Sequence, residues 1–192
     1  MSFDFIDNLD TLLAVMVGAV LATGGALVAE LVQDRLSQKR KERDAARFFG
    51  EILASVDLIL DRAFASMEIG ERWGDVTRRL FRTAVNEAAI YERNRERLFE
   101  IRDMDLRRVI HVHFLTEMVP LNALVETFLE IDALEADLKE TDDQSPARRA
   151  RLETELTERR ATLETALASI KLEHAKTDAI CARLEPLARV EF

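Results

Sequence analysis

The side chains best able to do chemistry in this sequence are its three histidines, the carboxylates near them and a single cysteine. His113 and Glu117 stand four positions apart, so on a helix they share one face, where an imidazole and a carboxylate could hold a metal ion. A carboxylate-bridged di-iron site needs Glu-x-x-His on two helices, and the sequence lacks this pattern. We therefore expect no metal ion and no cofactor.

The same residues also have a structural interpretation. Buried polar side chains are almost always hydrogen-bonded, so polar residues on the inner faces of a helical bundle should pair with one another or with arginines. The candidates for such buried polar positions are Glu87, Asn94, His113, Glu117 and His174. An enzyme with an unrecognised polar site around Glu87, His113 and Glu117 remains an alternative.

Nucleophilic catalysis is not indicated. Cys181 follows His174 by seven residues, which is roughly 10 Å along a helix and too far for a nucleophile and its base. The sequence contains no Gly-rich phosphate loop, no Gly-x-Ser-x-Gly and no Cys-x-x-Cys. We expect no catalytic residue and no enzymatic activity. A lone cysteine also excludes an intramolecular disulfide.

Composition indicates the kind of element that carries these residues. The chain has 192 residues with only 6 Gly and 3 Pro, and Ala, Leu, Glu and Arg are abundant, which is typical of long helices and predicts an all-α fold. A net charge of −9 disfavours general nucleic-acid binding, because an acidic surface repels the phosphate backbone. No nucleic-acid partner is expected.

An uncharged apolar run at residues 11–29 predicts a membrane-spanning helix, since about 28 Å of helix matches the thickness of a bilayer core. Asp4, Asp7 and Asp10 precede it, and a basic juxtamembrane set follows: Arg35, Lys39, Arg40, Lys41, Arg43 and Arg47. The positive-inside rule places the C-terminal side in the cytoplasm. A buried core helix of a soluble protein and a span of opposite orientation are the alternatives.

Small residues recur every fourth position in this run, at Ala14, Gly18, Ala22 and Ala26. Such a row lets two membrane helices approach closely and predicts homodimerisation. Gly and Ala are also common in membrane helices that do not associate, which is the competing interpretation.

The predicted domain organisation is a short extracytoplasmic N-terminus at residues 1–10, a transmembrane helix at 11–33, a basic juxtamembrane helix at 34–47 and a cytosolic bundle at 48–192. Apolar spacing predicts about four antiparallel bundle helices: one ending near Gly70, one at about 73–101, one from Met104 to about 138, and one from 147 to about 184. Pro120 predicts a kink or short break at Val119.

Residues 141–146 form the clearest loop, with Ser145 suited to cap the next helix and Pro146 to its first position. The last helix carries an apolar-side seam at Leu163, Leu167, Ile170, His174, Thr177, Cys181 and Leu184. Its charged first half is expected to project as the tip of a coiled-coil hairpin.

The stretch AAIYERNRERL at residues 88–98, followed by VIHVHFL at 109–115, resembles a segment of small bacterial single-pass membrane-anchored helical-bundle proteins of unknown function. The resemblance implies a location in the bacterial inner membrane and supplies no catalytic residues. The function we expect is a membrane-tethered interaction or scaffold protein. Its expected partners are the lipid bilayer, a second copy of the chain through the membrane helix and the coiled coil, and an unidentified protein. A sensor or effector in stress or phage defence, responding to a ligand or to the membrane state, is the alternative, and an apolar pocket near Pro120 would favour it.

Overall fold

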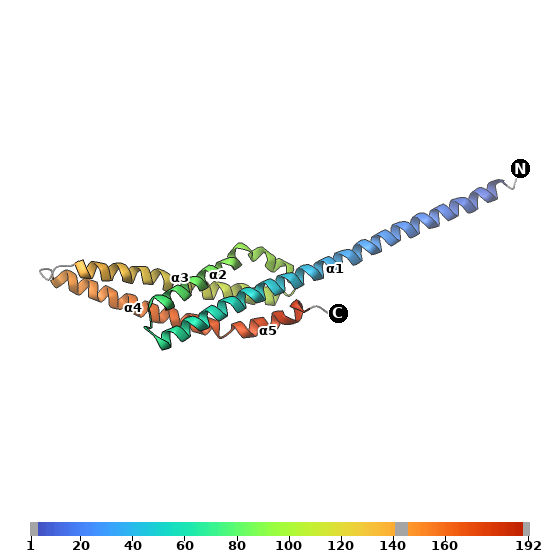
Figure 1. Cartoon of the computed structure of the whole chain (residues 1–192). Helices are drawn as coiled ribbons and strands as arrows, with labels where there is room; N and C mark the ends of the chain where they lie inside the picture. Colours follow the sequence, from blue (N-terminus) through green and yellow to red (C-terminus); the bar gives the residue numbers. More distant parts are fainter. Residues whose placement is uncertain (1–3, 141–145, 190–192) are drawn as a thin grey trace. The chain divides into compact units, whose positions relative to one another are not determined.

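The computed structural model describes residues 4–140 and 146–189, and every element in these two ranges is a helix (Figure 1). The elements are α1 (Asp4–Ile69), α2 (Asp75–Arg93), the 3₁₀-helix η1 (Arg95–Glu100), α3 (Met104–Glu140), α4 (Pro146–His174) and α5 (Thr177–Ala188). The prediction of an all-α chain is confirmed. The predicted loop residues 141–145, Ser145 included, lie outside the described ranges, and Pro146 occupies the first position of α4 as expected.

The chain divides into two compact units, residues 1–42 and residues 43–192, with the boundary inside α1. The side chains of residues 13–41 in the N-terminal unit are exposed, including the apolar Val20 and Leu21. One helix of the described chain is long and apolar enough to cross a membrane, and none of its apolar window is buried.

The C-terminal unit has a core to which all five of its helical segments and η1 contribute. Its centre is aromatic: Tyr91 of α2 and Phe114 of α3 are stacked with ring centroids 4.0 Å apart, and Phe49 of α1 packs against Tyr91. The same face of α1 continues with the buried Leu53, Val56 and Leu60, which keep the helical spacing seen in the sequence.

α3 and α4 lie side by side (Figure 1). Ion pairs join Arg159 to Glu130 at 3.2 Å and Arg160 to Glu135 at 3.0 Å, while His113 near the start of α3 lies close to Glu173 at the end of α4. The order of contacts therefore runs in opposite directions along the two helices.

α3 begins at Met104, as the sequence predicts, and Asp103 directly precedes it. Its Oδ1 accepts hydrogen bonds from the backbone N–H groups of Asp105 at 2.9 Å and Leu106 at 3.0 Å, which satisfies two of the unpaired donors of the first turn. These bonds to the ionised form lower the pKa of the Asp103 carboxyl.

Three predicted boundaries differ from the structure. The second bundle helix ends at Arg93 rather than near Ile101, because the Asn94 side chain donates to the Ile90 carbonyl and a 3₁₀ segment follows. α3 continues through Pro120 without a break. The last predicted helix is two helices, since Lys176 N–H bonds to the carbonyl of Glu173, three residues back, and interrupts the α-helical pattern.

Candidate functional site

The predicted membrane-helix row and basic set lie on α1. Ala14, Gly18, Ala22 and Ala26 are exposed, and a Cβ added at Gly18 would meet nothing within 4 Å. In the basic set, Arg43 is half-buried and lies 3.7 Å from Asp44, while Arg47 donates to the Ala188 carbonyl at 3.5 Å.

Of the five predicted buried polar residues, the structure buries two. His113 is 3% exposed and Glu117 is 1% exposed, whereas Glu87, Asn94 and His174 are half-buried. Among the described residues no hydrogen bond or ion pair links Glu87 to His113 or Glu117, and Asn94 is occupied at the end of α2. The grouping of Glu87 with His113 and Glu117 is therefore not found.

His113 and Glu117 lie on the inner face of α3, but they are not tightly paired. Nε2 of His113 is 3.6 Å from a carboxylate oxygen of Glu117 and 3.4 Å from the Thr177 hydroxyl of α5. Nδ1 of His113 is 3.8 Å from Glu173, and neither this nitrogen nor Oε1 of Glu117 has a hydrogen-bond partner. Buried polar atoms without partners are uncommon in folded proteins, which makes His113 and Glu117 candidates for a functional site.

Burial shifts the pKa values of these two residues in opposite directions. It raises the pKa of Glu117 to about 7, assisted by the negative charges of Asp57 and Glu173, and it lowers the pKa of His113. Both shifts favour the neutral forms, because a charge without a close partner is costly in an apolar interior.

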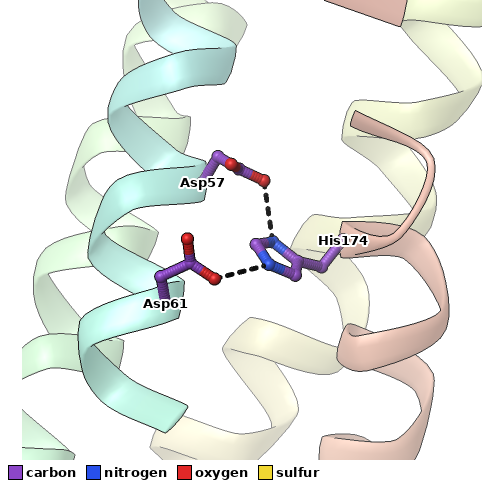
Figure 2. Close-up of side chains that lie close together, drawn as sticks. All are labelled: Asp57, Asp61 and His174. Carbon is purple, nitrogen blue, oxygen red and sulfur yellow. Dashed lines mark hydrogen bonds and ion pairs between the residues drawn. The ribbon is translucent and has the colours of Figure 1, made fainter. Parts of the chain in front are cut away.

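His174, at the end of α4, lies between two carboxylates of α1 (Figure 2). Its Nε2 hydrogen-bonds Asp61 Oδ1 at 3.1 Å, and its Nδ1 is 2.9 Å from Asp57 Oδ1. Burial raises the pKa of Asp57, against the opposing effect of His174. Asp57 and Asp61 are four residues apart on one face of α1, which places both carboxylates within reach of the one ring.

Thr177 connects the two groups of polar residues. Its hydroxyl approaches His113, and a hydrogen bond from Thr177 also favours the ionised form of Asp57. Polar side chains from α1, α3, α4 and α5 therefore form one continuous network through the C-terminal unit. We call Asp57, Asp61, His113, Glu117, Glu173, His174 and Thr177 the inter-helix polar network.

Sequence reasoning missed Asp57, Asp61 and Glu173 and included Thr177 only in the seam of the last helix. Asp57 and Asp61 sit at ordinary charged positions of an amphipathic helix, so their spacing alone carries no signal. Their pairing with His174 depends on how α1 packs against α4. Cys181 is half-buried, and burial raises the pKa of its thiol, which makes it a poor nucleophile.

A cavity of about 380 Å³ opens beside the network between α3 and α5. Its walls include Val109, Val112, His113, Lys176 and Ile180, so it does not lie at Pro120, where a ligand pocket would have favoured the sensor interpretation. Within residues 4–140 and 146–189, Asp57, Asp61 and His174 form a group that could hold a metal ion, because their donor atoms lie within 4.8 Å of one another.

Comparisons with known proteins assign no family to this arrangement: no family model matches the chain, and no curated protein or solved structure shows significant similarity to it.

Proposed function

We propose that the chain is a single-pass membrane protein whose residues 48–192 form a cytosolic interaction or scaffold module. The observation that carries this proposal is the apolar window of α1, of which no part is buried against the rest of the chain. A soluble helix normally buries an apolar stripe, whereas a membrane helix is apolar on all sides. The basic set that follows the window supports an orientation with the N-terminus outside.

The proposed module is an antiparallel bundle of about four helices, the last of which is divided into α4 and α5, with a coiled-coil hairpin. Opposed contacts between α3 and α4, buried Leu156 and Leu163, and the cross-helix pairs of Arg159 and Arg160 support it. A coiled-coil hairpin offers long exposed faces to a partner helix, which suits a scaffold. A location in the bacterial inner membrane rests on the sequence resemblance.

Orientation is tested by reporter fusions after Phe192 in bacterial cells. A green fluorescent protein there should fluoresce, and an alkaline phosphatase there should be inactive, because the first folds in the cytoplasm and the second requires the periplasm. The same fusions to a chain that begins at Arg43 provide the cytoplasmic reference. Phosphatase activity after Phe192 would show that the orientation is reversed.

Self-association through the small-residue row is tested by replacing Gly18 and Ala22 with isoleucine. The signal of a bacterial membrane two-hybrid assay should fall severalfold, because branched side chains hold the two backbones apart. A Cβ added at Gly18 meets nothing within 4 Å in the chain, so the loss would report on a partner helix. Val20→Ile, on the opposite face, is the matched control, and a signal that both variants leave unchanged contradicts the dimer.

A second candidate function is a sensor or effector that responds to its surroundings through the bundle. The specific observation that favours it is the pair His113 and Glu117, two buried titratable residues with unpartnered atoms at the contact of α3 with α5. A change in their protonation would alter the packing of these helices.

A further inference from the structure

The two ring nitrogens of His174 are in different situations. Nε2 makes an aligned hydrogen bond to Asp61, and since an ionised carboxylate only accepts, Nε2 carries the hydrogen. Nδ1 is buried and has no hydrogen-bond partner, although Asp57 Oδ1 is 2.9 Å away. Figure 2 shows the ring held between the two carboxylates in this way.

An imidazole with its hydrogen on Nε2 has a lone pair on Nδ1. Two electron-rich atoms as close as Nδ1 and Asp57 Oδ1 require a cation beside them. A proton shared by Nδ1 and Asp57 Oδ1 would have to lie close to the line that joins the two atoms. Nδ1 has no hydrogen-bond partner, so the ring is not aligned for such a bond. A metal ion fits the off-line arrangement, since two ligands each about 2.0–2.2 Å from zinc lie about 3 Å apart at a right angle and about 3.4 Å apart at a tetrahedral angle, which a small movement of either side chain supplies.

The surroundings of Asp57 supply a second, independent reason for a cation. Glu117 is buried to 1% exposure, its Oε1 has no partner, and the charge of Asp57 acts on it directly. Asp61 and Asp178 place further negative charge around Asp57. Negative charge therefore exceeds positive charge around Asp57, although the chain has 27 lysines and arginines in total.

We propose that Asp57 and His174 bind a divalent transition-metal ion of the zinc class through Asp57 Oδ1 and His174 Nδ1. Asp61 acts as the positioning residue, because its bond to Nε2–H fixes the tautomer that frees Nδ1, as carboxylates commonly do for metal-bound histidines. Imidazole and carboxylate ligands suit Zn²⁺. Water completes the coordination from the side of Asp57, whose side chain is 27% exposed.

The test uses the full chain in an uncharged detergent, labelled with ¹⁵N-histidine, stripped with a chelator and titrated with ZnCl₂. The chain has three histidines, so each ring is resolved, and His111, whose Nδ1 contacts the Tyr91 hydroxyl, is the internal reference. Zinc should shift His174 Nδ1 in a saturable manner at one ion per chain and leave the His111 ring unchanged. No shift at His174, or an equal shift at His111, overturns the proposal and leaves an imidazolium ion pair.

Variants separate the ligand from the positioning residue. Asp57→Asn should abolish saturable binding, whereas Asp61→Asn keeps an acceptor oxygen for Nε2–H and should weaken binding about tenfold. Asp132→Asn, an exposed carboxylate of α3 paired with Arg78, is the matched control and should bind as the wild type does. Fluorescence of the single Trp73 confirms that each variant is folded. Wild-type zinc affinity in Asp57→Asn, or loss of binding in Asp61→Asn alone, overturns the assignment.

Discussion

Glu117→Gln should stabilise the chain by about 3 kcal/mol at pH 8 and change its stability little at pH 4. In the folded chain the pKa of Glu117 is raised from 4.5 to about 7, chiefly because the carboxyl is buried. The folded state therefore holds the proton more tightly than the unfolded state does. The contribution of Glu117 to the free energy of unfolding is therefore fully present below pH 4.5 and is lost as the pH rises through 7.

The neutral glutamine keeps the shape of the protonated glutamic acid and cannot ionise, so it removes this loss. His113 acts in the opposite sense: its pKa is lowered from 6.5, so its contribution to stability is lost as the pH falls below that value. Because both proteins contain His113, the difference in unfolding free energy between wild type and variant isolates Glu117.

The measurement is chemical unfolding of the full chain in an uncharged detergent at pH 4, 6 and 8, followed by the fluorescence of Trp73. This residue packs against Phe128 and so reports on the C-terminal unit. Glu126→Gln, an exposed glutamate on the same helix, is the matched control and should show no such trend. A Glu117→Gln variant that is equally destabilised at all three pH values would mean that Glu117 is ionised and paired in the folded state.

Helices could be predicted from the sequence wherever the apolar spacing is regular and a residue that favours a helix end lies at the boundary. Pro146 is such a signal and stands at the first position of α4. α3 begins at Met104, where the apolar spacing predicts a helix to begin. The break between α4 and α5 has no Gly or Pro, and the seam through His174 and Thr177 keeps its spacing across it. Tertiary packing rather than local propensity sets that boundary.

The candidate site divides in the same way. His113 and Glu117 could be found because they are polar residues interrupting one apolar face of a single helix, a pattern visible within a few positions. The contact of His174 with Asp57 and Asp61 joins residues more than a hundred positions apart, and each is unremarkable on its own helix. A single sequence does not indicate which of the charged residues of α1 face α4.

Replacing Val17 and Val20 with arginine should release the chain from the membrane fraction. An arginine near the centre of a membrane helix costs about 2.5–3.5 kcal/mol, so the pair costs about 6 kcal/mol, enough to reverse insertion. Both valines are exposed within the chain, so the C-terminal unit loses no packing. The measurement is the distribution of the chain between a carbonate-washed membrane pellet and the soluble fraction. The matched control replaces two exposed valines of the C-terminal unit, Val76→Arg and Val119→Arg.

A double variant that stays in the washed pellet would show that the apolar run does not hold the chain there. A wild-type chain found as a soluble oligomer would instead favour the alternative of a soluble protein, in which other copies of the chain bury this helix.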